Sequence, residues 1–299
     1  MDTNILLESG SNELEVLEFM LAGNSYGINV AKIKEIIAWQ EVTPVPNSHP
    51  SVEGIFMPRD KMITAIDLRN CLQRGLSDKD GRFIITNFNK LDIAFHVEEV
   101  VGIHRVSWSE IIKPDSTMSS TEAGISTGIV KIENKLIIIL DFEKIISDIN
   151  PEAGLRISEI EDLGKRNRSN VPLLICEDSP LLNKLIVNCL KAAGYHNLIH
   201  TENGQEAYDI IQDCLMKDTL NDYVKCIITD IEMPIMDGHR LTKLVKSEPK
   251  TRDIPVVIFS SLINEEMRRK GESLGANAQL TKPEIANLVR TVDELVIGL

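Results

Sequence analysis

Acidic, hydroxyl and basic residues end four short apolar runs in the second half of the chain. Each run has the length of a buried strand, and uniformly apolar strands are typical of a parallel sheet with both faces covered. The runs and the residues at their ends are Val171–Cys176 with Glu177 and Asp178, Cys226–Thr229 with Asp230, Ile254–Phe259 with Ser260, and Ala278–Thr281 with Lys282. Because the carboxyl ends of parallel strands meet at one edge of the sheet, we expect these side chains to converge.

The residue types at this edge favour phosphoryl chemistry. Carboxylates from Glu177, Asp178 and Asp230 repel one another unless a cation lies between them, and all-oxygen ligands suit Mg²⁺. The Ser260 hydroxyl and the Lys282 ammonium are groups that stabilise a tetrahedral oxyanion beside such a metal. The sequence therefore predicts a phosphoryl site with Mg²⁺ as its cofactor.

Residues 171–299 resemble the receiver domain of two-component response regulators, and the resemblance rests on five elements that match in order and spacing. These elements are the pair Glu177-Asp178, the acceptor Asp230, the Met-Pro and Asp-Gly pairs behind it, Ser260, and Lys282-Pro283. A receiver domain is an α/β doubly wound, flavodoxin-like fold around a five-stranded parallel sheet. Strands alternate with helically spaced apolar residues over 180–192, 206–215 and 283–296, as this fold requires.

The resemblance assigns a role to each site residue. Asp230 would be the phosphorylated nucleophile, since a carboxylate can form a reversible acyl phosphate. Asp178 and Asp230 would ligate Mg²⁺ directly, Glu177 would do so directly or through water, and Glu232 would offer its backbone carbonyl. The phosphoryl oxygens would be bound by Lys282 and Ser260.

One position departs from the receiver pattern. Receivers commonly carry an aromatic switch residue three positions before the lysine, and this chain has Gln279 there. The departure indicates that output runs through Ser260 and the neighbouring loops rather than through a rotating aromatic ring.

The first half of the chain reads as many short strands with polar turns, which is typical of an all-β barrel or sandwich. Residues 30–37 have helical spacing, and residues 142–149 are expected to close the domain as a helix. The strands are expected at residues 14–21, 26–30, 52–57, 62–67, 82–88, 91–97, 100–107, 125–133 and 135–141. No catalytic constellation accompanies them, so this half is interpreted as a binding module.

Residues 13–150 are similar to the CheW family of chemotaxis coupling proteins. The similarity rests on the hairpin Met57-Pro-Arg-Asp60 and on Thr64-Ala-Ile-Asp-Leu68. It implies a double SH3-like barrel that binds chemoreceptors and the regulatory domain of a CheA-type histidine kinase. It also makes Arg59 the interface residue, and Glu35 is expected to orient Arg59 through a bidentate pair.

Composition excludes several other classes of function. A net charge of −13 and a pI near 5.0 argue against nucleic acid as the main partner, because a phosphate backbone needs a basic patch. The five scattered cysteines favour a reduced, cytoplasmic protein. No apolar run approaches the roughly 20 residues of a membrane span, so membrane contact is expected only indirectly, through receptors in their arrays.

The whole chain is interpreted as four segments: a disordered tail over 1–12, a coupling domain over 13–150, a linker over 151–170 and a receiver over 171–299. This arrangement resembles the CheV-type coupling proteins, which implies a signalling adaptor tuned by Asp230 phosphorylation and not an enzyme. An alternative is a phosphate sink that drains the kinase. A third is a phosphohydrolase of the haloacid-dehalogenase type, although Glu232 stands where that class has a second aspartate.

Overall fold

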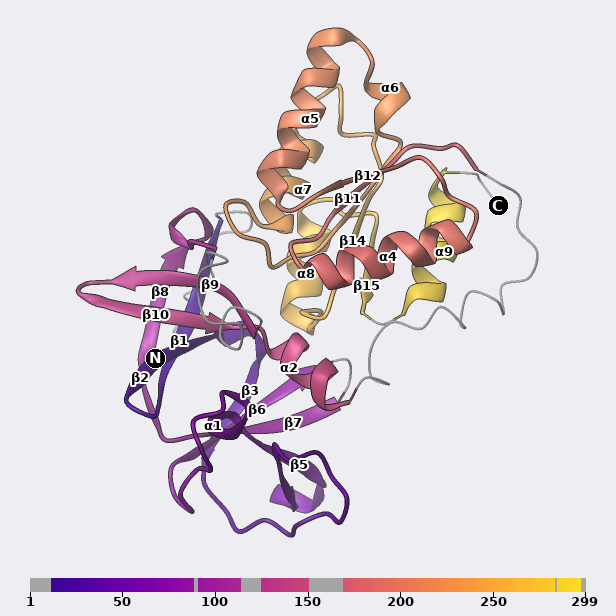
Figure 1. The fold of residues 1–299 in the computed structure, drawn as a ribbon. Helices are drawn as coiled ribbons and strands as arrows, with labels where there is room; N and C mark the ends of the chain where they lie inside the picture. The colour runs from indigo at the N-terminus through magenta and orange to yellow at the C-terminus, as the bar shows by residue number, and fades with distance from the viewer. Residues whose placement is uncertain (1–11, 89–90, 114–124, 151–168, 283, 297–299) are drawn as a thin grey trace. The chain divides into compact units, whose positions relative to one another are not determined.

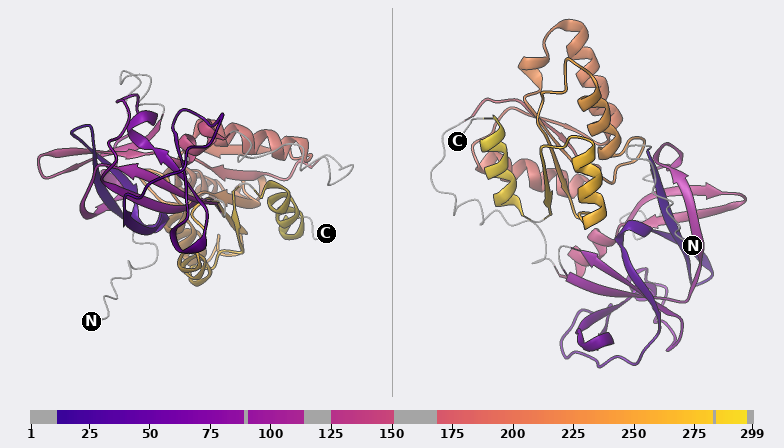
Figure 2. Two further views of the ribbon diagram at one scale, coloured as in Figure 1. Left: turned by 90° about the horizontal axis from the view of Figure 1, so that it is seen from below. Right: turned by 180° about the vertical axis from the view of Figure 1, so that it is seen from behind.

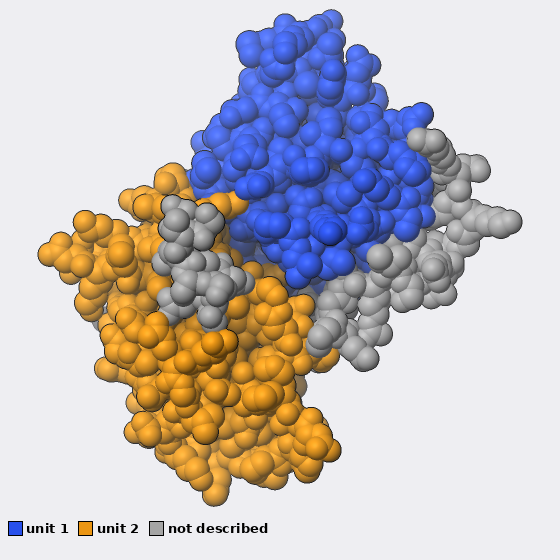
Figure 3. All heavy atoms as spheres, in the orientation of Figure 1, with its two compact units in different colours: residues 1–13, 154–299 blue, residues 14–153 orange. Residues whose placement is uncertain are grey.

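The computed structural model describes residues 12–88, 91–113, 125–150, 169–282 and 284–296 of the chain. These residues form two compact units, one of residues 14–153 and one of residues 154–299 together with residues 1–13 (Figure 3). None of the helices in the described ranges is long and apolar enough to cross a membrane. We call the first unit the coupling unit and the second the receiver unit, and each is described by itself.

The coupling unit contains two five-stranded sheets, with strand orders β8-β1-β2-β10-β9 and β3-β6-β7-β5-β4 (Figure 1). The strands are β1 (Glu13–Leu21), β2 (Asn24–Asn29), β3 (Ile33–Ala38), β4 (Val52–Phe56), β5 (Ile63–Asp67), β6 (Arg82–Phe88), β7 (Leu91–Val97), β8 (Glu99–Ser107), β9 (Ser126–Ile132) and β10 (Lys135–Leu140). Short helical segments join them: η1 (Val30–Lys32), η2 (Pro58–Asp60), α1 (Leu68–Cys71), η3 (Trp108–Glu110) and α2 (Phe142–Ile149). The predicted all-β class is confirmed.

Helix α2 closes the core that the two sheets share. Asp141 caps its first turn by accepting a hydrogen bond from the Lys144 amide. Its Phe142 ring meets Phe19 of β1 and Phe95 of β7 in edge-to-face contacts, with centroids 6.5 and 4.7 Å apart. One apolar cluster thereby joins strands from both sheets, so the two sheets belong to one domain.

The prediction of a helix over residues 30–37 is wrong. Residues 33–38 form strand β3, which pairs antiparallel with β6. Side chains along β3 alternate between half-buried and exposed, so Ile36 faces outward although its spacing from Val30 and Ile33 suggested a helical core face. Pairing with β6 therefore outweighs the local helical pattern.

The receiver unit is a single parallel sheet of strand order β12-β11-β13-β14-β15. Its strands are β11 (Leu173–Cys176), β12 (Leu198–Thr201), β13 (Cys226–Thr229), β14 (Val256–Ser260) and β15 (Ala278–Thr281). Its helices are α4 (Pro180–Ala192), α5 (Gly204–Lys217), α6 (Leu220–Tyr223), α7 (Gly238–Ser247), α8 (Glu265–Ser273) and α9 (Ile285–Val296). This is the doubly wound fold that the sequence predicts.

Helices cover both faces of this sheet (Figures 1 and 2). Leu173 and Ile175 of β11 pack with α4 and α9, whereas Leu174 and Cys176 pack with α5 and α7. Because successive strand residues point to opposite faces, a sheet covered on both sides needs apolar residues at every position. This explains the unbroken apolar runs, and it leaves only the strand ends for polar residues.

Candidate functional site

The pairing of β11 with β13 brings two of the acids together. Cys176 lies beside Thr229 in the parallel register, so Glu177 and Asp230 leave the sheet at the same level. The Asp230 amide donates a hydrogen bond to the Cys176 carbonyl oxygen at 2.9 Å, which extends the pairing by one residue. The backbone pairing therefore fixes the position of the Asp230 carboxylate.

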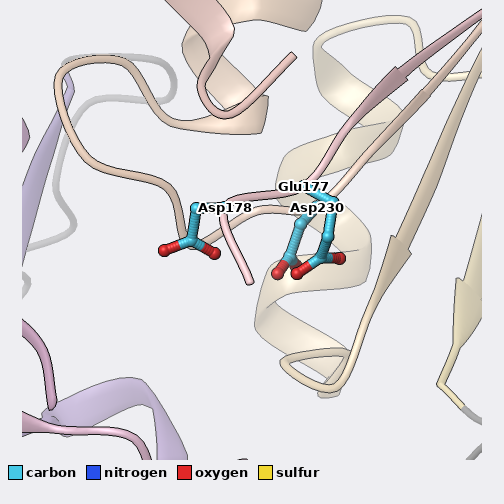
Figure 4. A group of neighbouring side chains, drawn as sticks. All are labelled: Glu177, Asp178 and Asp230. Atoms are coloured by element: carbon cyan, nitrogen blue, oxygen red, sulfur yellow. The ribbon is translucent and has the colours of Figure 1, made fainter. Parts of the chain in front are cut away.

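Glu177, Asp178 and Asp230 form an acidic cluster at this edge, in which one carboxylate oxygen from each residue lies within 4.8 Å of the other two. The three carboxylates project to the same side of the strand ends (Figure 4). Glu177 and Asp230 are only 2% and 5% exposed, while Asp178 is half-buried. The three acids thus converge at one edge of the sheet, as expected from the sequence.

Lys282, which follows β15, is the counter-charge within the cluster. Its Nζ donates to Glu177 Oε2 at 2.7 Å and to Asp230 Oδ2 at 3.0 Å, and its side chain is 4% exposed. One ammonium cannot balance three ionised carboxylates, and an unbalanced charge is expensive to bury. The donor set thus has the charge and the oxygen ligands to hold a divalent cation.

The loop after Asp230 folds back on Asp230 itself. The Ile231 amide donates to Asp230 Oδ1 at 2.6 Å, and the Gly238 amide donates to the Ile231 carbonyl at 3.0 Å. A Cβ on Gly238 would lie 1.8 Å from the Asp230 carbonyl oxygen, so only glycine fits at this helix start. Asp237 caps α7 by accepting from the Arg240 amide, which anchors the other end of the loop.

Burial shifts the pKa values of two residues at the start of α7. It raises the pKa of Asp237 to about 6, against the hydrogen bond from the Arg240 amide. It lowers the pKa of His239 to about 3, so this imidazole is neutral at physiological pH. Neither residue belongs to the acidic cluster, and no pattern in the sequence indicates their burial.

The remaining predicted receiver residues lie around the cluster. Ser260 is the last residue of β14 and is fully buried, and its Oγ accepts a hydrogen bond from the Leu262 amide at 3.2 Å. Glu232 is half-buried in the loop after Asp230, and its carboxylate is not part of the described cluster. Pro283, for which a cis peptide was considered, lies outside the described residues.

Arg59 and Glu35 come together on the surface of the coupling unit. Arg59 Nη2 donates to Glu35 Oε2 at 2.8 Å, and the two side chains are 81% and 26% exposed. Arg59 stands in η2, between β4 and β5, with a left-handed backbone (φ 53°). Met57 and Met62 flank this turn and are more than half exposed. The turn presents one guanidinium between two apolar side chains.

A second charged group lies near this turn and stiffens it. Asp92 of β7 accepts hydrogen bonds from Lys34, Lys61 and Asn87. Burial by itself would raise the pKa of Asp92, but these hydrogen bonds outweigh burial and lower the pKa to about 2. Lys61 thus ties the residue after η2 to the sheet.

The coupling unit also contains an ion pair between His96 and Glu53, which no spacing in the sequence indicates. His96 is 1% exposed, with Nδ1 2.9 Å from Glu53 Oε2 and Nε2 2.5 Å from the Asp80 carbonyl. Both ring nitrogens face acceptors, an arrangement that favours the doubly protonated imidazolium. Burial would lower the pKa of His96, but the bonds to Glu53 and to the Asp80 carbonyl raise it above its ordinary value.

Comparison with known proteins places both units in families. Residues 15–150 match the CheW-like domain family, and residues 173–293 match the response regulator receiver domain family. The chemotaxis protein CheV3 of Helicobacter pylori is 28% identical over 301 residues, which cover 95% of each chain. The chemotaxis protein CheW of Thermotoga maritima is 31% identical over 151 residues, or 50% of this chain and 98% of that protein.

The crystal structure of the scaffolding protein TtCheW from Thermoanaerobacter tengcongensis is similar to this chain, with 24% sequence identity and a TM-score of 0.41. The similar region covers 48% of this chain and 90% of the TtCheW chain. The order of the two family matches is the order of the two units in the chain. The match to CheV3 runs through both units and spans nearly the full length of each protein. The chain therefore belongs to the CheV-type family of chemotaxis coupling proteins, in which a CheW-like domain precedes a response regulator receiver domain.

Proposed function

We propose that this protein couples chemoreceptors to a CheA-type histidine kinase in the cytoplasm, at receptor arrays, and that phosphorylation of Asp230 adjusts the coupling. The observation that carries the proposal is the buried group of Glu177, Asp178, Asp230 and Lys282 in a chain that also holds a CheW-like domain. One unit offers a surface for partners, and the other offers an acceptor whose charge can change.

The phosphoryl transfer forms one bond to phosphorus, at the Asp230 carboxylate, and breaks another. An oxygen of Asp230 forms a bond to phosphorus while the P–N bond of a phosphohistidine on the kinase breaks. The electron pair of that bond stays on the imidazole nitrogen, and Asp230 carries an acyl phosphate. The chain is then a phosphorylated substrate that assists its own modification, rather than an enzyme that acts on other molecules.

The carboxylates of Glu177, Asp178 and Asp230 suit Mg²⁺, since each offers an oxygen ligand and these three oxygens lie within 4.8 Å of one another. Glu232 adds a backbone carbonyl two residues after the acceptor. Bound Mg²⁺ would offset negative charge on the transferring phosphoryl group. The ion pairs of Lys282 with Glu177 and Asp230 support a second role, in which its ammonium turns from these carboxylates to a phosphoryl oxygen.

Ser260 is proposed to bind the phosphoryl group once it is in place. Its hydroxyl now accepts a hydrogen bond from the Leu262 amide and can donate its own proton to a phosphoryl oxygen. A move of this hydroxyl toward Asp230 would break the bond to Leu262 and shift the chain that follows. In this way, phosphorylation of Asp230 would change the structure outside the phosphoryl site.

The coupling unit is proposed to bind receptor and kinase through the turn that carries Arg59. An exposed arginine between Met57 and Met62 combines a charge with apolar contact area, and arginine is enriched at the energetic centres of interfaces. Glu35 binds the guanidinium through one hydrogen bond, from Arg59 Nη2 to Glu35 Oε2. Charge reversal, Arg59→Glu, is expected to abolish capture by receptor and kinase fragments, and undiminished capture would contradict the assignment.

The test of the acceptor is phosphotransfer from a labelled chemotaxis kinase in the presence of Mg²⁺. Wild type is expected to take the label and Asp230→Asn is not, while Asp213→Asn, at an exposed aspartate of α5, serves as the matched control. No label on wild type would refute the proposal. Kinase activity in receptor arrays is then compared with and without label. Rapid loss of label with unchanged coupling would instead identify a phosphate sink.

The same samples test whether the chain is a hydrolase. Turnover of p-nitrophenyl phosphate that depends on Asp230 would point to a phosphohydrolase. We expect none, since the proposed donor is a phosphohistidine held by a partner protein.

A further inference from the structure

Helix α8 is lightly anchored to the receiver sheet. Its sequence, Glu-Glu-Met-Arg-Arg-Lys-Gly-Glu-Ser, has a single apolar side chain, and Met267 and Gly271 are its buried residues. The two apolar clusters that cover the sheet draw on α4, α5, α7 and α9, but no residue of α8 belongs to either within the described ranges. Little apolar burial holds this helix, so individual polar contacts have a large share in its position.

One such contact comes from Gln279 on the adjacent strand β15. The Gln279 side chain is buried, and its Nε2 donates to the Arg268 carbonyl oxygen of α8 at 2.7 Å. Arg268 Nη1 in turn reaches the Gln279 carbonyl oxygen at 3.5 Å. Helix and strand are therefore tied by a reciprocal pair of hydrogen bonds.

Gly271 makes room for this tie. A Cβ at Gly271 would lie 2.3 Å from Gln279 Oε1 and 2.6 Å from its Cδ. The Gln279 carboxamide thus occupies the space that the Cβ of any other residue type at position 271 would need. Glycine inside a helix is less favourable than alanine, so this position lowers the stability of the helix and admits the glutamine.

The tie leaves one buried atom without a partner. Gln279 Oε1 accepts no hydrogen bond from the described residues, although its amide nitrogen is satisfied. A buried, unpaired acceptor is unfavourable by an amount comparable to what a hydrogen bond contributes. The gain from one end of the carboxamide is therefore offset at the other, and the docked position of α8 is finely balanced.

A short connection links α8 to the phosphoryl site. Ser260 ends β14, its Oγ bonds the Leu262 amide, and α8 begins after Asn264, whose side chain caps it through the Met267 amide at 2.8 Å. A movement of Ser260 toward Asp230 would pull on the capped start of α8. The tie at Gln279 opposes that pull.

We propose that Gln279 is a positioning residue whose carboxamide holds α8 against β15, and that release of α8 from Gln279 is the conformational step that phosphorylation of Asp230 drives. The release step rests on the proposed function, whereas the tie itself can be tested on the unmodified protein.

The first experiment measures hydrogen exchange of the α8 amides in the full-length, unmodified chain. Gln279→Met keeps the length of the side chain but cannot donate, and we expect α8 to exchange about fivefold to tenfold faster, with β11 and β13 unchanged. Gly271→Ala should do the same by displacing the carboxamide. An alanine by itself would stabilise the helix and slow exchange, so faster exchange is specific to loss of the tie.

Two controls match these variants. Gln205→Leu removes a glutamine that bonds Asp209 on the surface of α5, and Gly102→Ala adds a Cβ where no atom lies within 4 Å. Neither should change exchange in α8. If α8 in Gln279→Met exchanges within about twofold of wild type while the receiver core stays protected, the tie is refuted.

The second experiment repeats the exchange after phosphotransfer, with label on Asp230 measured in the same samples. Wild-type α8 should speed up to the rate of Gln279→Met, and that variant should take label but change little further. Labelled wild type with unchanged α8 would overturn the release step and leave the proposed function intact. Unlabelled wild type would overturn the proposed function and the release step with it, while the first experiment still decides the tie.

Discussion

Two ion pairs in this molecule have nearly the same distance but different surroundings. Lys282 lies 2.7 Å from Glu177 with both side chains at most 4% exposed, and Arg59 lies 2.8 Å from Glu35 with the arginine 81% exposed. Distance alone would rank the two pairs as equals. Water screens the second and not the first, so burial decides how each pair contributes.

The difference corresponds to two ways of using charge. In the receiver unit, buried charges respond strongly to one another, so a change of charge on Asp230 must be felt by Lys282 and by the strand ends. In the coupling unit, the Arg59 guanidinium is paired with Glu35 but is largely exposed, so the pair adds little to stability. Four variants test this contrast, and they are ordered by the size of the expected change in stability.

The largest effect is expected for Lys282→Met in the absence of divalent cations. Loss of the ammonium leaves Glu177 and Asp230 buried without their counter-charge, and breaking a buried pair typically costs about 3–5 kcal/mol. Urea unfolding, followed by exchange of the β11 and β13 amides, measures the loss. Lys217→Met removes a solvent-exposed pair with Asp213 and should have no measurable effect. Equal losses in both variants would contradict the contrast.

Gly238→Ala is expected to come second. The new Cβ would meet the Asp230 carbonyl at 1.8 Å, and overpacking of this kind costs about 1–3 kcal/mol, occasionally more. Because the clash falls on the acceptor itself, the rate of phosphotransfer should fall together with receiver stability. Gly102→Ala, which meets no atom within 4 Å, should change neither. Normal phosphotransfer in Gly238→Ala would show that the loop can move away without consequence.

The acidic cluster could be predicted because its logic is local to the strand ends. A strand buried on both faces must be apolar, so Glu177, Asp178 and Asp230 could only mark its carboxyl edge. Strand β12 escaped notice because Leu198–Thr201 is short, partly polar and at the edge of the sheet. The contacts of Gly238 with Asp230 and of Gly271 with Gln279 depend on how a helix is placed against a neighbouring strand, and no residue pattern within these segments indicates them. His96 is buried against Glu53 and the Asp80 carbonyl, which lie 43 and 16 residues away in sequence.

The contrast between the two units is most easily contradicted at His96, because this residue forms a buried ion pair in the coupling unit. Hydrogen bonds to Glu53 and the Asp80 carbonyl outweigh burial and raise the pKa of His96 above 6.5. A raised pKa means that the folded protein binds the proton more tightly than the unfolded chain does. The stabilisation is complete below pH 6.5 and is lost as the pH rises through the raised pKa.

The coupling unit should therefore be more stable at pH 6 than at pH 9, and His96→Gln should remove that part of the pH dependence. Both tryptophans, Trp39 and Trp108, belong to the coupling unit, so urea unfolding followed by their fluorescence reports on it alone. Identical pH dependence in wild type and His96→Gln would show that this imidazolium is not the group that titrates.

The smallest change in stability is expected for Arg59→Ala. A solvent-exposed pair contributes little, so the free energy of unfolding of the coupling unit should change by less than about 0.5 kcal/mol. Capture by receptor or kinase fragments should fall all the same, since the guanidinium is proposed to serve binding. A large loss of stability with unchanged capture would reverse the interpretation of this turn.

The strand order of the coupling unit also governs how the chain can fold as it is synthesised. Every strand of the sheet β3-β6-β7-β5-β4 lies between β2 and β8, so one sheet is nested in sequence inside the other. Hairpin β6–β7 closes over a few residues, whereas Tyr26 of β2 pairs with Ile138 of β10 only when most of the domain has been made. We expect the inner sheet to form while β1 and β2 are still unpaired with β8 and β10. Pulse-labelled hydrogen exchange should therefore find the amides of β6 and β7 protected before those of β10.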